Sequence, residues 1–144
     1  TEGSKPHTWL SNCGGSIGFA LPAATGASIA CPERKVIALE GDGSGMYTLQ
    51  SLWTIARENL NVTILIFANQ SYRILHGELN NVGVQNPGPS AINMLTLNNP
   101  SLDWVSLSKG MGIDAKKVHD TDQLYSVFKD ALNSHGPFLI EVMI

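Results

Sequence analysis

The chain has 144 residues, of which 43% are hydrophobic and 15% charged, and its formal net charge is −3. This length is enough for one domain with a sizeable core, and the low charged fraction favours a surface partly covered by a partner. The acidic balance without a Lys/Arg cluster excludes nucleic-acid binding, and no apolar run reaches the roughly 18 residues of a membrane span. We therefore expect a globular domain that binds neither nucleic acid nor membrane.

Two observations concern the compartment and the extent of the chain. Cys13 and Cys31 have no CxxC metal spacing and do not make a disulfide framework, so we expect reduced thiols and a cytoplasmic protein. The sequence begins at Thr1 without a signal-peptide pattern. We expect residues 1–144 to be a single domain from a longer protein.

The first half of the chain predicts alternating helices and strands. Small residues at 14–30 indicate a glycine turn followed by a closely packed helix, and the apolar run 35–41 indicates a buried strand. Residues 46–60 place apolar side chains at helical spacing. The β-branched run 62–69 predicts a strand buried on both faces, and 71–79 a short helix.

The second half opens with residues 80–100, whose Asn, Gly and Pro predict a long loop, which we expect to be mobile and to fold over the site. A helix at 101–112, a strand at 115–119, a helix at 121–134 capped by Thr121 and a strand at 137–144 follow. This alternation predicts an α/β fold: a doubly wound, mostly parallel sheet with helices on both faces.

The segment GDGSG places a single carboxylate, Asp42, between Gly41 and Gly43 at the end of a predicted strand. Ligands of doubly wound sheets bind at this edge, and flanking glycines allow close approach. The amides of Gly43 and Ser44 suit an anion, whereas a carboxylate beside a phosphate is repulsive unless a cation lies between them. The pattern is neither a Walker loop nor a Rossmann fingerprint, and it suggests Mg²⁺ bridging protein and phosphate.

A second oxygen donor follows the next strand. Asn69 stands at the same predicted sheet edge as Asp42, one helix and one strand later, and the backbone carbonyl of Ser71 could be a third ligand. The alternative is structural: Asp42 caps the following helix and Asn69 makes a turn. The spacing of the two residues favours the metal site.

These residues resemble the motif of thiamine-diphosphate-dependent enzymes, a GDG followed by Asn-Asn after the next strand. Here 25 residues separate Gly43 from Asn69, and Ala68 replaces the first Asn of the pair. The resemblance implies that Asp42, Asn69 and the Ser71 carbonyl bind Mg²⁺. It also implies cofactor contacts for the residues around them: Gly41, Gly43, Ser44 and Tyr72.

The amino-terminal segment CGGSIGFALPAATGA resembles the glycine turn of the acetolactate synthase and benzoylformate decarboxylase type. In that family a backbone carbonyl accepts from the cofactor's amino group, and an apolar side chain wedges the cofactor into a bent shape. The resemblance assigns these roles to Gly15 and Ile17, with Ser16 between them. The chain would be the carboxyl-terminal, diphosphate-binding domain.

The resemblance also implies what lies outside this domain. The family's activating glutamate belongs to a pyrimidine-binding domain, usually of the partner subunit, so no catalytic residue is expected here and the domain alone should be inactive. A homodimer or homotetramer is implied, and FAD is possible in the full-length protein. Ile74 and Leu75 are candidates for the substrate pocket, and His76 and Glu78 either contact substrate or are solvated.

The implied function is thiamine-diphosphate- and Mg²⁺-dependent decarboxylation and carboligation of 2-oxo acids, as in acetolactate synthase. Simple decarboxylation of the benzoylformate type is the alternative within the family. A non-catalytic relative, such as a regulatory or nucleotide-binding α/β domain, is the alternative from another class. It would keep the sheet and lose the metal set that Asp42 and Asn69 represent.

Overall fold

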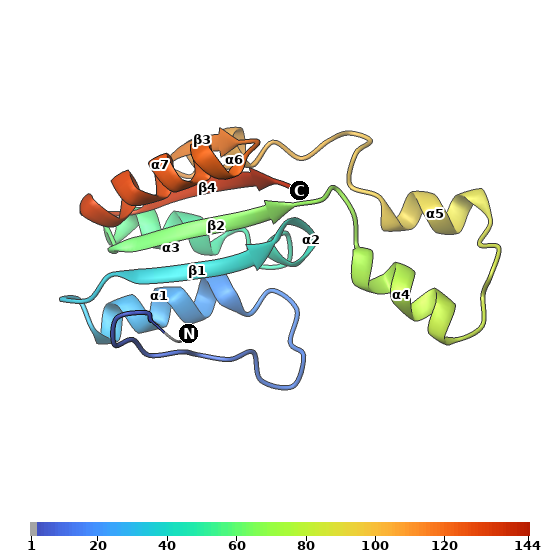
Figure 1. The fold of residues 1–144 in the computed structure, drawn as a ribbon, viewed down its shortest axis with the longest axis horizontal. Helices are drawn as coiled ribbons and strands as arrows, with labels where there is room; N and C mark the ends of the chain where they lie inside the picture. Colours follow the sequence, from blue (N-terminus) through green and yellow to red (C-terminus); the bar gives the residue numbers. More distant parts are fainter. Residues whose placement is uncertain (1–2) are drawn as a thin grey trace.

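The computed structural model describes residues 3–144, and Thr1 and Glu2, which the predicted domain includes, lie outside them. Its centre is a four-stranded parallel sheet with the order β1-β2-β4-β3 (Figure 1). The strands are β1 (Val36–Gly41), β2 (Val62–Ala68), β3 (Asp114–Val118) and β4 (Phe138–Met143). The two central strands, β2 and β4, are apolar and buried along most of their length, as suits strands that are covered on both faces.

The strand order explains which helices cover which face. The chain advances across the sheet from β1 to β3 and then returns, placing β4 between β2 and β3. Right-handed crossovers require a change of face when the direction reverses. Accordingly α1 (Ala20–Ala30), α3 (Ser51–Arg57) and α6 (Trp104–Gly110) pack on one face, and α7 (Thr121–Asn133) packs on the other.

Two apolar clusters form the core, one on each face of the sheet. The larger contains Leu21, Leu52, Ile64 and Trp104, all fully buried, and the smaller lies between β4 and α7. The predicted doubly wound, mostly parallel fold with helices on both faces is therefore confirmed. None of the helices within residues 3–144 is long and apolar enough to cross a membrane.

The structure corrects two details of the predicted helices. The predicted helix 46–60 is shorter: a four-residue helix, α2 (Asp42–Gly45), follows β1 directly, and α3 begins only at Ser51. The cap of α7 is Asp120 rather than Thr121, because the Asp120 carboxylate accepts the N–H of Gln123 at 2.8 Å. Asp120, one residue before the predicted cap, thus accepts a backbone N–H of the first turn of α7 that has no partner within the helix.

Residues 73–95 form an arm of two helices instead of the helix and long loop that were predicted. The arm consists of α4 (Arg73–Asn81) and α5 (Pro89–Leu95), and it projects from the carboxyl edge of the sheet (Figure 1). Pro89 stands at the first position of α5, where a missing N–H costs no helical hydrogen bond. No residue of α4 is buried, so the arm has little contact with the body.

Candidate functional site

Three segments meet at the carboxyl edge of the sheet: the glycine turn 14–18, the segment 42–48 after β1, and the turn 69–72 after β2. Asp42 opens α2 and is only 3% exposed. Its Oδ1 accepts the N–H of Gly43 at 2.9 Å, and its Oδ2 accepts the N–H of Gln70 at 2.7 Å. Asp42 therefore joins the ends of two neighbouring strands.

The turn after β2 presents further oxygen atoms. The Asn69 side-chain oxygen accepts the N–H of Ser71 at 2.9 Å, and Gln70 between them has a φ of 55°. This left-handed residue reverses the chain within two residues of the strand end. It brings Asn69 and Ser71 beside Asp42.

A short antiparallel bridge orients the carbonyl of Ser71. Ser71 pairs with Thr96, and the flanking bonds run from Tyr72 N–H to the Leu95 carbonyl at 2.9 Å and from Leu97 N–H to the Gln70 carbonyl at 2.7 Å. In such a non-hydrogen-bonded pair, both backbone groups of the central residue point away from the opposite strand. The Ser71 carbonyl therefore faces away from residues 95–97, on the side where its N–H meets Asn69.

The electrostatics of Asp42 fit a cation. Burial raises the pKa of its carboxyl, and hydrogen bonds from the backbone around Gln70 and Gly43 oppose this shift. Neither of the ion pairs found within residues 3–144 involves Asp42, so no side chain there balances its charge. A buried carboxylate, an amide oxygen and a backbone carbonyl are hard oxygen donors of the kind Mg²⁺ takes. The residues present therefore fit a divalent cation.

Gly43 is required by the ring of Tyr72. A Cβ on Gly43 would lie 2.7 Å from Cδ1 and 2.8 Å from Cε1 of that ring. Tyr72 also meets Tyr47 edge-on, with ring centroids 6.5 Å apart. Its pKa is raised by burial and by the nearby Tyr47 and Asp42. The aromatic pair packs the segment 42–48 against the turn 69–72.

The glycine turn has its own internal support. Gly14 and Gly15 have φ values of 67° and 66°, which L side chains rarely adopt. The Asn12 side chain binds both backbone groups of Ser16, accepting its N–H at 3.0 Å and donating to its carbonyl at 3.2 Å. Ile17, just beyond, is 45% exposed. The turn thus presents a large apolar side chain to its surroundings.

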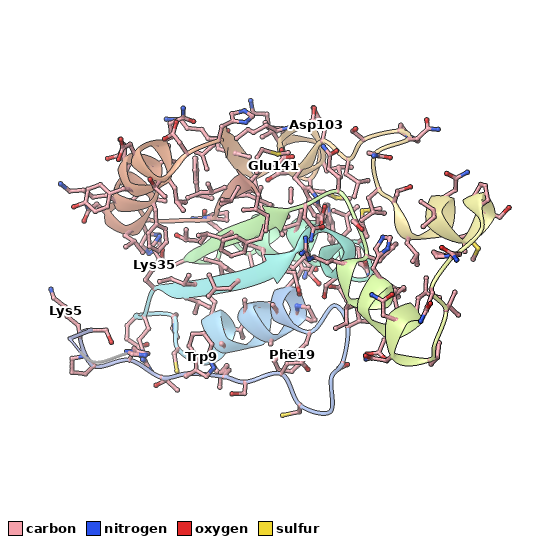
Figure 2. The ribbon with its side chains drawn as sticks, turned by 45° about the vertical axis from the view of Figure 1, so that its right-hand side comes forward. Lys5, Trp9, Phe19, Lys35, Asp103 and Glu141 are labelled. Atoms are coloured by element: carbon pink, nitrogen blue, oxygen red, sulfur yellow. The ribbon has the colours of Figure 1, made fainter. Side chains whose placement is uncertain are left out.

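The glycine turn and the segment after β1 are directly bonded. The Gly18 N–H donates to Ser44 Oγ at 2.8 Å, and the Ala20 N–H donates to Glu40 Oε2 at 3.1 Å. A hollow of about 350 Å³ opens beside them, lined by Asn12, Ser16, Phe19, Glu40 and Ser44 among others. Trp9 and Phe19, which also line it, lie on the α1 side of the molecule (Figure 2). Asp42 and Asn69 lie outside this hollow.

The structure brings most of the predicted site residues together. The segments carrying Gly15 to Ile17, Gly41 to Ser44, and Asn69 to Tyr72 are connected by the bonds above. Ile74 and Leu75 follow in the first turn of α4 and are 70% and 42% exposed, and neither lines the hollow beside the glycine turn. The sequence interpretation missed Asn12, Glu40 and Thr48. An Asn two residues before a double glycine is a turn signal that could have identified Asn12.

Known proteins of similar sequence identify the relatives of this chain. A putative acetolactate synthase large subunit, IlvX, of Mycobacterium tuberculosis is 43% identical over 145 residues, covering 100% of this chain and 28% of that protein. Benzoylformate decarboxylase of Pseudomonas aeruginosa is 33% identical over 142 residues, covering 98% of this chain and 25% of that protein. The chain thus spans about a quarter of the length of these relatives.

A solved structure has the same fold, and a family model matches the sequence. The 4-hydroxybenzoylformate decarboxylase of Rhodococcus jostii aligns with a TM-score of 0.78 and 36% identity, over 88% of this chain and 23% of that one. The model described as "Thiamine pyrophosphate enzyme, C-terminal TPP binding domain" matches residues 2–142. The chain therefore belongs to the thiamine pyrophosphate enzymes and corresponds to their C-terminal TPP binding domain.

Proposed function

We propose that this domain binds the diphosphate of thiamine diphosphate through Mg²⁺, within an enzyme that decarboxylates and ligates 2-oxo acids as acetolactate synthase does. The observation that carries the proposal is the buried, uncompensated Asp42 carboxylate beside the Asn69 and Ser71 oxygens. A divalent cation there would balance the carboxylate and present a positive charge to a diphosphate. The relatives named acetolactate synthase favour the carboligating reaction.

The other predicted residues would hold and orient the cofactor. The N–H of Gly43 already donates to Asp42, whereas Ser44 Oγ accepts from Gly18 and keeps its own O–H free to donate to a phosphate oxygen. The Gly15 carbonyl would accept a hydrogen bond from the cofactor's amino group, and the exposed Ile17 side chain would support the bent shape of the cofactor. The bound cofactor supplies the carbanion chemistry, whereas the protein supplies position and electrostatics.

Full activity requires parts beyond this domain. The activating glutamate is proposed to come from a pyrimidine-binding domain, of the same or a partner subunit, in a cytoplasmic homodimer or homotetramer. FAD, where the full-length protein uses it, would bind another domain. Ile74 and Leu75 remain proposed substrate contacts, and their exposure leaves both available to such a partner.

Simple decarboxylation is the second candidate. Solved decarboxylases of the benzoylformate type align closely, and that of Polynucleobacter necessarius does so with a TM-score of 0.78 and 32% identity. The products from pyruvate distinguish the two reactions, because a carboligase yields acetolactate and a simple decarboxylase yields acetaldehyde. Benzoylformate tests the aromatic preference in the same assay.

The first experiment is a calorimetric titration of the longest natural chain carrying this sequence with thiamine diphosphate, with and without Mg²⁺. We expect Mg²⁺-dependent binding, which Asp42→Ala abolishes while the variant stays folded by circular dichroism. Asp103→Ala, a carboxylate outside the site, is the matched control and should bind as wild type. Unchanged binding by Asp42→Ala would show the metal assignment to be wrong, and no binding by wild type would favour the non-catalytic relative.

A further inference from the structure

Gly18, the residue after the predicted wedge Ile17, is held by both of its backbone groups. Its N–H donates to Ser44 Oγ at 2.8 Å, and its carbonyl accepts from Thr48 Oγ1 at 2.8 Å. Both partners are side chains of the segment after β1, 26 and 30 residues away. The glycine turn is therefore attached to the segment that carries Asp42.

Packing makes this attachment specific for glycine. A Cβ on Gly18 would lie 2.9 Å from Tyr47 Cβ and 3.0 Å from Thr48 Cγ2. The φ of Gly18 is 76°, a conformation that a side chain would strain. The space that a Cβ of residue 18 would need is thus already occupied by the side chains of Tyr47 and Thr48.

We propose that Thr48 is a positioning residue. By holding the Gly18 backbone it sets how far the Ile17 side chain projects into the site, and hence the bend of the bound cofactor. Ile17 is 45% exposed, so packing does little to place it. Its position follows from its two neighbours: Ser16 is held by Asn12, and Gly18 by Thr48 and Ser44. The inference rests on the proposed function, since it needs thiamine diphosphate in the site.

Ser44 and Thr48 have different tasks in this arrangement. Ser44 Oγ accepts from Gly18, which leaves its O–H for a phosphate. Thr48 donates its only hydroxyl proton to the Gly18 carbonyl and is committed to the turn. Loss of the Thr48 hydroxyl should therefore affect the thiamine part of the ligand and leave the diphosphate part untouched.

The test compares two ligands, each with Mg²⁺, on the longest natural chain carrying this sequence. Inorganic pyrophosphate probes the metal and phosphate half of the site alone, and thiamine diphosphate probes both halves. For Thr48→Val we expect thiamine diphosphate to bind roughly fivefold to tenfold more weakly, the effect of one lost hydrogen bond. Pyrophosphate should bind within about twofold of wild type.

Two further variants separate positioning from general damage. Thr25→Val is the matched control, because Thr25 Oγ1 donates to the Leu21 carbonyl at 2.9 Å inside α1 and does not touch Gly18. It should bind both ligands as wild type. Thr48→Ser keeps the hydroxyl and should bind thiamine diphosphate as wild type. This variant still tests the role of the hydroxyl if Thr48→Val folds poorly.

The outcomes are distinct. Three outcomes would overturn the positioning role while the proposed function stands. Thr48→Val could lose the same affinity for both ligands, it could bind both as Thr25→Val does, or Thr48→Ser could bind thiamine diphosphate as weakly as Thr48→Val. If wild type binds pyrophosphate but not thiamine diphosphate, or neither ligand, the proposed function fails and the positioning role falls with it. A selective loss that serine rescues establishes the role.

Discussion

Asp42 experiences two opposing influences. Burial raises the pKa of its carboxyl, and the backbone N–H groups of Gln70 and Gly43 lower it without cancelling the effect. A bound cation would favour the ionised form much more strongly than these hydrogen bonds do. The residue is thus suited to a metal and is poorly stabilised as an isolated anion.

This balance predicts a pH dependence of metal binding. Protons would compete with the proposed Mg²⁺ for the Asp42 oxygens, so the affinity for Mg²⁺ with thiamine diphosphate should fall as the pH is lowered. Because burial raises the pKa of Asp42, the decline should begin above the ordinary aspartate value of about 3.9. Calorimetry over a pH series measures it, with the titration of the free Mg²⁺–cofactor complex subtracted.

Asp42→Asn is the control for this titration. It cannot ionise, so its binding should be weak at every pH and show no decline of its own. A wild-type affinity that stays constant down to about pH 4 would contradict the assignment of Asp42 as the titrating ligand.

Gly43 should be intolerant of a side chain, unlike Gly41. The Gly43→Ala methyl would overlap the Tyr72 ring, and we expect a loss of about 1–3 kcal/mol in the free energy of unfolding. Nothing lies within 4 Å of a Cβ at Gly41, whose φ is −85° and ψ 152°, so Gly41→Ala should be neutral or slightly stabilising. The midpoint of urea unfolding measures the stability of each variant, provided that the denaturant slope is unchanged. Equal losses of stability in Gly43→Ala and Gly41→Ala would argue against the Tyr72 contact.

At the scale of single elements, α6 depends on its cap. Asp103 accepts the N–H of Ser106 at 3.0 Å and its hydroxyl at 2.6 Å, and these bonds lower the pKa of Asp103. Asp103→Ala should therefore lose about 1 kcal/mol of stability at neutral pH. The folded-state pKa lies below the unfolded value, so this contribution is present above the unfolded pKa and disappears as the pH falls through the folded one.

The measurement is the difference in unfolding free energy between wild type and Asp103→Ala at neutral and acidic pH. Asp103→Asn retains a side-chain oxygen for the cap without titrating, so it should stay within a few tenths of a kcal/mol of wild type at neutral pH. An alanine variant as stable as wild type at neutral pH would show that α6 does not need the cap.

The elements with a strong local pattern were predictable, and those that depend on distant contacts were not. The strand at 62–69 and the helix at 121–134 match β2 and α7 within a residue or two, because their apolar spacing is decisive. Helix α5 was missed because its composition resembles a loop. Tertiary hydrogen bonds help to hold its end, since the Leu95 carbonyl accepts from Tyr72 and Ser71 of the turn 69–72.

At the scale of the whole molecule, one ion pair connects β3 with the buried centre of β4. Lys117 Nζ lies 3.1 Å from Glu141 Oε1, and the Glu141 side chain is 1% exposed against 35% for Lys117. Lys117→Met would leave a buried carboxylate unpaired. We expect a loss of roughly 2–3 kcal/mol in stability, below the full range for deeply buried pairs because Lys117 reaches solvent.

Lys116→Met is the matched control for this pair. Lys116 is the neighbouring lysine of β3, and strand alternation places its side chain on the opposite face of the sheet from Lys117. Its replacement should change stability by less than about 0.5 kcal/mol. Thermal or urea unfolding of the two variants checks the prediction. Similar losses of stability in both would show that the Lys117–Glu141 pair does not stabilise the fold more than an exposed lysine does.

The sequence alone determined the alternation of helices and strands, the parallel sheet, and the placing of Asp42 and Asn69 at one sheet edge. These features follow from apolar periodicity and glycine chemistry, which act over a few neighbouring residues. Only the tertiary structure decided that Thr48 and Ser44 bind Gly18, that Tyr72 covers Gly43, and that Ser71 turns its carbonyl away from residues 95–97. Those contacts join residues 24 to 30 positions apart, and no local pattern encodes which distant partner a backbone group will meet.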